Sequence, residues 1–187
     1  GVSHMPVREA LKQLAAEGLL EHVPYKGVRV LGFSVEDVED LYACRAFVEG
    51  RAARHAARQL EPATLRAMRE LHGRMAACTT PEALDEYREL NRQFHQLLYD
   101  ACERPFLTRL LGTIWNAFPR MLWNSFSATA HTAIPGREVA DTREHEEILR
   151  ALEDRDPVAV EQAIRRHIEA AGHELVATLR RKEIHTA

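Results

Sequence analysis

The chain has 187 residues, of which 45% are hydrophobic, and its formal net charge is -3 at pH 7. This length and apolar content suffice for a packed core, which excludes a disordered chain. The charge excludes a polycation that would bind nucleic acid over its whole surface. Ala, Leu, Arg and Glu dominate the composition and only 6% of residues are aromatic, so we predict a mainly α-helical fold.

The first predicted element is a short amphipathic helix in MPVREALKQLAAEG, for which Ser3 is placed as the N-cap and Gly18 as the end. Its apolar stripe consists of Val7, Leu11, Leu14 and Ala15. The following stretch, LLEHVPYKGVRVL, contains two strand-like runs around a turn with Tyr25, Lys26 and Gly27. This pattern predicts a β-hairpin with a basic tip.

These residues resemble the second half of a GntR-type winged helix-turn-helix, through the string PVREAL, the L-x-x-EGL that follows it, and the basic wing with its glycine. The resemblance implies that residues 1–31 are a partial DNA-binding domain, and that the helix from about His4 to Glu17 is its recognition helix. About two further helices would precede the turn at Gly1 in such a domain, so we expect this one to be truncated.

The same resemblance implies which residues contact operator DNA. Arg8 is the candidate for base contact, and Ser3, His4 and Lys12 are candidates for phosphate or base-edge contacts. Lys26 and Gly27 would form the wing tip at the minor groove. Without the resemblance, Arg8 and Lys12 would be a solvated pair of like charges on a surface helix.

After a brief linker at 32–34, six helices are predicted, at about 35–60, 62–77, 81–102, 105–128, 137–154 and 157–182. Ser34 and Asp37 form a capping box at the start of the first helix. Pro81 and Pro157 take the first position of the third and sixth helices, and Pro119 predicts a kink in the fourth. Residues 131–136 are predicted to be a loop. The short connections predict an antiparallel all-α bundle of six or seven helices.

Residues 35–187 resemble the FCD effector-binding domain of the FadR-like branch of GntR regulators. The resemblance depends on LYACRAFVEGRAARHAA, on FHQLLYDA, and on the H-x-x-IL-x-AL-x-x-x-D…H pattern from His145 to His167. It implies an effector-binding and dimerisation domain in a homodimeric regulator that is not an enzyme. Three cysteines without CxxC spacing, and no apolar run of membrane-spanning length, predict a cytoplasmic protein with reduced thiols.

Asn91 and His95 lie four residues apart on a helical face with apolar neighbours, so both side chains should point inward. His145 and His167 occupy similar positions on two further helices. One such histidine alone favours a hydrogen-bonded core residue, but three favour a metal site with open positions for water or a ligand carboxylate. The FCD resemblance implies an Asp where this chain has Asn91, whose neutral amide predicts weaker binding of a divalent transition metal such as Zn or Ni.

Arg45 matches an arginine common in this domain type, and a guanidinium beside a metal would suit a carboxylate effector. An ion pair with Glu49 is the alternative. Arg88, one turn before Asn91, is a second effector-binding candidate.

The sequence therefore predicts a ligand-responsive transcription regulator that binds a small organic acid and a two-fold operator. Two alternatives stay open. One is a His-rich metalloenzyme, for which only Glu146 and Asp141 are available as acid or base. The other is a truncated sensing and dimerisation module without DNA binding.

Overall fold

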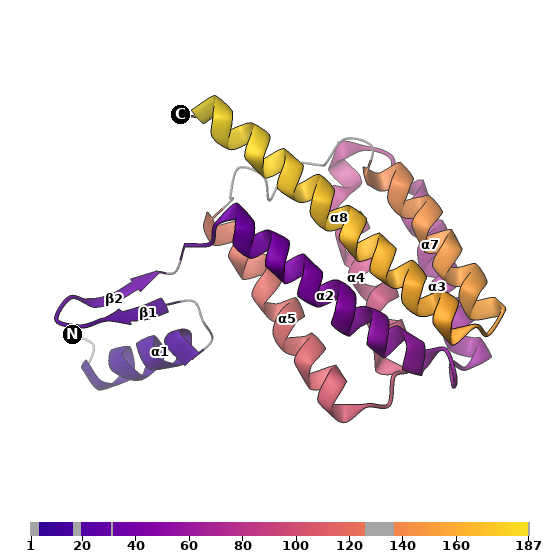
Figure 1. Cartoon of the computed structure of the whole chain (residues 1–187), viewed down its shortest axis with the longest axis horizontal. Coiled ribbons are helices and arrows are strands. Elements are labelled where there is room, and N and C mark those ends of the chain that lie inside the picture. The colour runs from indigo at the N-terminus through magenta and orange to yellow at the C-terminus, as the bar shows by residue number, and fades with distance from the viewer. Residues whose placement is uncertain (1–3, 17–19, 31, 126–136, 187) are drawn as a thin grey trace.

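The computed structural model describes residues 4–16, 20–30, 32–125 and 137–186. These residues are mainly α-helical, as predicted, with one two-stranded antiparallel sheet near the N-terminus (Figure 1). The elements are α1 (His4–Ala16), β1 (Leu20–Val23), β2 (Gly27–Val30), α2 (Val35–Ala56), α3 (Pro62–Ala77), η1 (Pro81–Ala83), α4 (Leu84–Asp100), α5 (Pro105–Ser125), α7 (Arg137–Glu153) and α8 (Pro157–Thr186).

The predicted hairpin is present, with Leu20 opposite Val30 and Val23 opposite Gly27. Its turn is closed by a hydrogen bond from the Lys26 amide to the Val23 carbonyl at 3.0 Å. Gly27 has a φ of 97°, which a glycine adopts without steric cost. The apolar stripe of α1 is only partly covered, because Val7 and Leu14 are exposed and the short hairpin offers little apolar surface.

Most of the predicted helix starts are confirmed. Ser34 accepts a hydrogen bond from the Asp37 amide, and the Asp37 carboxylate accepts one from the Ser34 amide, which completes the capping box. Asp156 caps α8 by accepting from the amides two and three residues later, with Pro157 at the first helical position. The last helix extends to Thr186, beyond the predicted end near residue 182.

Three further predicted helix boundaries were wrong. Pro81 begins the short 3-10 turn η1, closed by the Ala83 amide on the Thr80 carbonyl, and the α-helical part starts only at Leu84. The helix α4 ends at Asp100, two residues early, and α2 ends at Ala56 because its last predicted turn loses helical hydrogen bonding. The predicted end of the fourth helix at 128 and the loop at 131–136 lie outside the described residues.

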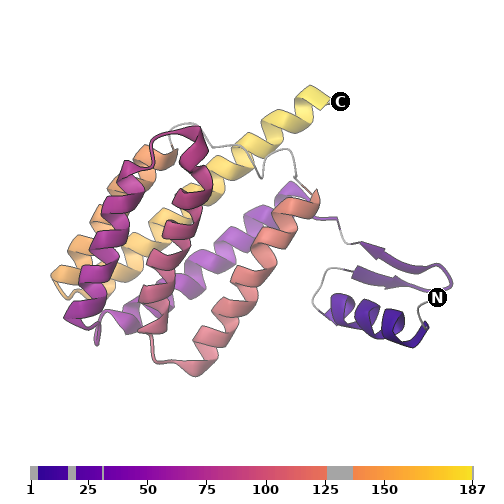
Figure 2. The same ribbon diagram turned by 180° about the vertical axis from the view of Figure 1, so that it is seen from behind.

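The helices α2 and α8 pack against each other in opposite directions, and both views show them side by side (Figures 1 and 2). Ion pairs join the two ends of this contact, from Arg180 to Glu39 and from Arg54 to Glu161. A Cβ added at Gly172 would lie 2.7 Å from the Cβ of Tyr42, so only a glycine permits this approach of the two backbones.

The helices α3, α4 and α7 complete the bundle around one hydrophobic core, and α5 lies at its edge beside α2 (Figure 2). Fully buried members of this core include Val38, Ala52, Met68, Phe94, Leu98, Ile148, Leu149 and Ile164. None of the helices in the described ranges combines the length and apolar content that a bilayer crossing requires.

Candidate metal and effector site

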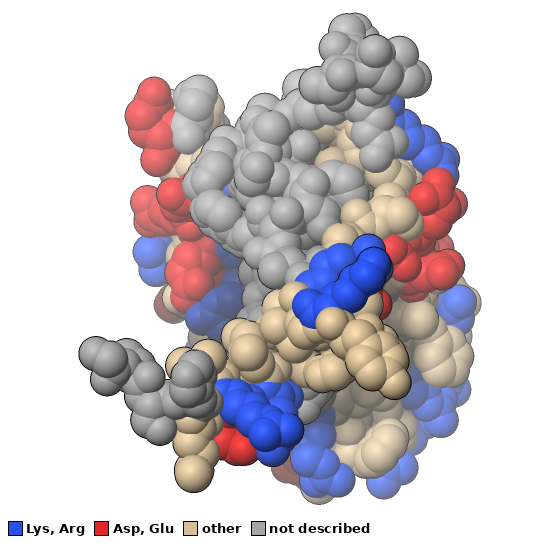
Figure 3. Space-filling model, turned by 90° about the vertical axis from the view of Figure 1, so that its left-hand side faces the viewer, with Lys and Arg blue, Asp and Glu red and all other residues tan. Residues whose placement is uncertain are grey.

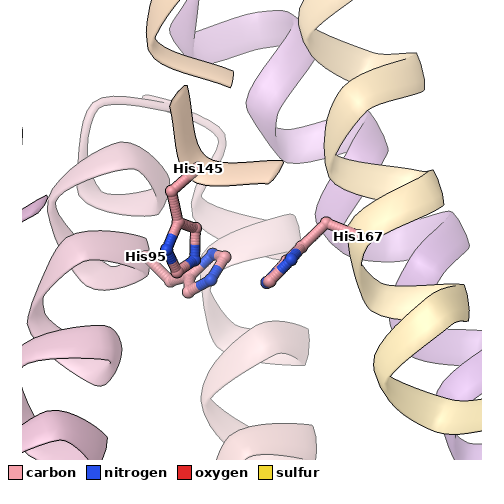
Figure 4. Close-up of side chains that lie close together, drawn as sticks. All are labelled: His95, His145 and His167. Atoms are coloured by element: carbon pink, nitrogen blue, oxygen red, sulfur yellow. The ribbon is translucent and has the colours of Figure 1, made fainter. Parts of the chain in front are cut away.

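Three histidines from three helices meet inside the bundle, as predicted. His95 comes from α4, His145 from α7 and His167 from α8, and all three are buried (Figure 4). One ring nitrogen of each lies within 4.8 Å of one ring nitrogen of the others. Three imidazoles at this separation can share one ion as ligands.

Several polar atoms of this cluster are buried without a hydrogen-bond partner among the described residues. They are the Nε2 atom of His95 and both ring nitrogens of His145; the Oδ1 atom of Asn91, one helical turn before His95 on α4, is also buried without a partner among the described residues. A buried polar atom without a partner costs about 1–3 kcal/mol, so such a group needs an explanation. Imidazole nitrogens and an amide oxygen are ligands of divalent transition metals, and these residues therefore fit a metal ion.

Burial also keeps two of the imidazoles in the form that binds metals. The pKa of His95 is well below its ordinary value, mainly because burial disfavours the charged ring and also because His167 and Arg45 are close. The pKa of His145 is lowered for the same main reason, with His167 and His95 adding to the effect. Neutral imidazole, which offers a lone pair to a metal, is thus the favoured state.

Arg45 lies next to this cluster, and the ion pair that was its alternative role is also formed. Its Nε atom donates to Glu49 at 2.7 Å, and both side chains are buried. Its guanidinium lies over the rings of Tyr42 and Trp115, at 4.7 and 5.0 Å from the ring centres. The Trp115 ring is in turn 6.0 Å from the His95 ring, which places the guanidinium at the edge of the histidine cluster.

Arg88 is placed differently. Its side chain is 40% exposed and pairs with Asp85 at 3.6 Å, and no contact described for it reaches the histidines. A long cationic side chain on a half-buried position extends toward water, which explains this direction.

A second group of charged residues adjoins His167, and sequence reasoning missed most of it. Arg137 is buried and forms ion pairs with Asp141 and Glu144. Glu144 accepts from the Nδ1 atom of His167 at 2.8 Å, and Tyr87 donates to Asp141 at 2.6 Å. The spacing of Arg137, Asp141 and Glu144 at i, i+4 and i+7 was a signal that these charges share one helical face.

The two acid–base candidates of the metalloenzyme alternative separate in the structure. Asp141 lies beside His167 but is engaged by Arg137 and Tyr87. Glu146 faces away from the cluster and pairs with Arg69 at 3.1 Å. It lines a surface groove of about 640 Å³ between α3 and α7, together with His72 and Thr142.

The residues predicted to contact DNA lie on the projecting N-terminal elements. Arg8 is exposed on α1, and Lys12 is exposed and pairs with Glu9 at 2.8 Å. Lys26 and Gly27 are exposed at the hairpin tip. His4 begins α1, whereas Ser3 lies outside the described residues. Viewed from this end, the molecule exposes several Lys and Arg side chains (Figure 3).

A helix and basic hairpin followed by a helical bundle are the arrangement of one class of protein, the DNA-binding regulators that carry a second, helical domain. Residues 40–170 match the FCD domain family, and residues 1–30 match the gntR family of bacterial regulatory proteins. The chain therefore belongs to the GntR family of transcriptional regulators, in the group with an FCD domain. It is a regulator and not an enzyme, which removes the metalloenzyme alternative.

Known relatives agree with this assignment. The chain is 31% identical over 169 residues to the HTH-type transcriptional repressor RspR of Escherichia coli K12. The aligned residues are 90% of this chain and 71% of RspR. It is 32% identical to a probable D-xylose utilization operon transcriptional repressor of Paenarthrobacter nicotinovorans, covering 91% and 72% of the two chains. A GntR family member from Pseudomonas syringae has the same fold, with a TM-score of 0.65 and 27% identity over 100% of this chain and 75% of that one.

Proposed function

We propose that this regulator senses a small organic acid in a metal-containing pocket, and that the acid controls how a homodimer binds a two-fold operator. The observation that carries the proposal is the meeting of three buried histidines whose ring nitrogens include three without a partner among the described residues. The ligands would be His95, His145 and His167, with the amide oxygen of Asn91 as a neutral fourth.

A bound Zn or Ni ion would supply positive charge and open coordination positions for a carboxylate. Arg45 would then orient the effector, because a guanidinium can bind both oxygens of a carboxylate. Glu49 already accepts from its Nε atom and the rings of Tyr42 and Trp115 lie against the guanidinium, so an effector would bind in addition to these contacts. Arg88 would contribute only after its side chain turned inward from Asp85.

The metal site is tested by metal analysis and anomalous scattering on the purified protein. Wild type should retain close to one equivalent of Ni or Zn after dialysis, and His145→Ala should lose it. His173→Ala is the matched control, because His173 is exposed on α8 only six residues from His167. Equal metal content in the two variants would refute the site.

The effector class is tested by calorimetry on the metal-loaded protein with small carboxylic acids. The proposal expects binding of an acid and no binding of its amide, since the amide lacks the charge that the metal and Arg45 would recognise. D-xylose belongs in the same panel, because a relative is named for a D-xylose operon. If D-xylose bound and none of the acids did, the effector would be a neutral sugar and the proposed acid would be wrong.

The proposed homodimer is supported by α5, whose sequence PFLTRLLGTIWNAFPRMLWNS contains two arginines and no acidic residue. Phe106 on this helix is 71% exposed, and Phe47 on the neighbouring α2 is 62% exposed. Exposed apolar side chains on neighbouring helices can form an interaction surface, and a two-fold dimer would bury the same surface of both copies. Phe106→Glu should therefore shift the protein to monomer in sedimentation, whereas Val139→Glu, on an exposed position of α7, should not.

Operator binding would use Arg8, His4 and Lys12 on α1, Ser3 before it, and Lys26 and Gly27 at the wing. We expect Arg8→Ala to weaken operator binding by about 1–3 kcal/mol and to relax sequence preference, as the loss of a base contact does. Lys26→Ala should weaken binding to all sequences alike. Footprinting at moderate salt that showed no sequence preference for wild type would favour a sensing module without DNA binding.

A further inference from the structure

A chain of four buried side chains runs from α2 to the histidine cluster. Arg45 donates from Nε to the Oε1 atom of Glu49 at 2.7 Å, and the hydroxyl of Tyr99 donates to the other oxygen of Glu49. The Nδ1 atom of His95 lies 3.1 Å from the Tyr99 hydroxyl oxygen. Glu49 and Arg45 are on α2, whereas Tyr99 and His95 are on α4.

The direction of these hydrogen bonds is fixed by the number of protons. A tyrosine hydroxyl has one proton, and a carboxylate beside a guanidinium only accepts, so the Tyr99 proton points to Glu49. The Tyr99 oxygen can then only accept from His95. His95 must therefore carry its proton on Nδ1, which leaves a lone pair on Nε2, the atom without a partner among the described residues.

We propose that Glu49 and Tyr99 are positioning residues, which hold His95 in the Nδ1–H tautomer so that its Nε2 lone pair faces the metal. The inference rests on the metal site of the proposed function. Carboxylates that act on a ligand histidine from outside typically contribute 10–100-fold to metal affinity. In this chain the carboxylate comes from a different helix and acts through a tyrosine.

His167 is held in the same tautomer by direct contact with a carboxylate. Its Nδ1 atom lies 2.8 Å from the carboxylate of Glu144, and an unprotonated nitrogen at this distance would be repelled by the oxygen. The guanidinium of Arg137 is farther from the same nitrogen, at 3.2 Å, and is paired with the carboxylates. Both ligands thus leave Nε2 for the metal, because the Nδ1 atom of His167 is bound by a carboxylate and that of His95 by a tyrosine that is itself bound to a carboxylate.

Glu49→Gln tests this inference because it reverses the direction of the hydrogen bonds between position 49, Tyr99 and His95 with little change in the shape of the side chain. Arg45 only donates, so the amide oxygen of the glutamine must face Arg45 and its NH2 group must face Tyr99. Tyr99 must then accept from the glutamine and donate its own proton to Nδ1 of His95. The proton of the imidazole moves to Nε2, where it blocks the metal.

Two measurements follow, with Glu161→Gln as the matched control. Glu161 is also a poorly exposed carboxylate that accepts from an arginine, Arg54, at 2.8 Å, but it lies on α8 and none of its described hydrogen bonds reaches Tyr99 or His95. Nitrogen-15 NMR of the histidine rings in metal-free protein should show Nδ1–H at His95 in wild type and in Glu161→Gln. The same spectrum should show Nε2–H in Glu49→Gln.

Competition with a chelator for Ni²⁺ should show about 10–100-fold weaker binding by Glu49→Gln and unchanged binding by Glu161→Gln. Tyr99→Phe, which keeps the ring and removes the acceptor, should also weaken binding and provides a second variant if Glu49→Gln folds poorly. Wild-type affinity in a folded Glu49→Gln or Tyr99→Phe protein would overturn the inference.

Failure of the metal site itself would give a different result. If wild type bound no Ni²⁺ or Zn²⁺, the proposed metal pocket would be wrong, and the ring tautomer would still decide the inference about Glu49 and Tyr99. Nδ1–H at His95 that changes to Nε2–H in Glu49→Gln would support their positioning role. Nε2–H in wild type would overturn it.

Discussion

Replacing Gly172 by alanine should separate α2 from α8 and destabilise the protein. The new Cβ would lie 2.7 Å from both Cβ and Cγ of Tyr42, whereas ordinary contacts begin at 3.4 Å. The gap is therefore about 0.7 Å too small, and Tyr42 cannot simply turn away because its ring lies under the Arg45 guanidinium. Overpacking of this kind costs about 1–3 kcal/mol.

Alanine also favours a helix over glycine by about 1 kcal/mol, so the steric cost must be measured against a second glycine. Gly73 in α3 has no atom within 4 Å of an added Cβ, and Gly73→Ala should stabilise the protein by about 1 kcal/mol. Urea denaturation followed by circular dichroism at one protein concentration should separate the two variants by about 1–3 kcal/mol. Equal stability of Gly172→Ala and Gly73→Ala would refute the close contact.

Three further predictions concern the metal, the histidines and the first bundle helix. Ni²⁺ at about 100 times its Kd should stabilise metal-free protein by about 2.7 kcal/mol and raise Tm by roughly 5–10 °C, an effect that His145→Ala should abolish. Because the pKa values of His95 and His145 are lowered on folding, the unfolded chain takes up protons first. The free energy of unfolding of the metal-free protein should therefore be constant above pH 6.5, the pKa of an unfolded histidine, and should decrease below it. Each of the two histidines should lower it by up to about 1.4 kcal/mol for each pH unit. A free energy of unfolding that did not change from pH ~7 to ~5 would contradict this prediction. Ser34→Ala should cost about 1 kcal/mol in urea denaturation through loss of the capping box, and no loss would mean that the cap is unimportant.

The helix order, most helix starts and the histidine cluster could be predicted because their signals are local. The capping residues Ser34 and Asp156 stand beside the amides that they bind, and their sequence context is sufficient. The histidines could be paired with one another because each lies on an apolar face of its own helix, and such faces meet in a bundle. The GntR and FCD resemblance then added the roles that spacing alone did not supply.

The hydrogen bonds around the cluster could not be predicted, because they depend on the register between helices. Arg45 and Glu49 are four residues apart, as are His95 and Tyr99, so each pair is visible in the sequence. The bond between Tyr99 and Glu49 joins positions 50 residues apart and requires the packed arrangement of α2 and α4. The 3-10 turn at Pro81 was missed for a related reason, since a proline suits the first turn of either kind of helix.

The helix α2 joins the hairpin to the bundle, and because it is long, a small tilt of the helix displaces its first residue by a larger distance. It begins at Val35, directly after the linker at 32–34, and carries Glu49 fourteen residues later. At 1.5 Å per residue this separation is about 21 Å, so a tilt of about 5° around Glu49 would move the start of the helix by roughly 2 Å. A small rotation of α2 about the carboxylate that accepts from Tyr99 would thus displace the start of this helix and, through the linker, the hairpin attached to it.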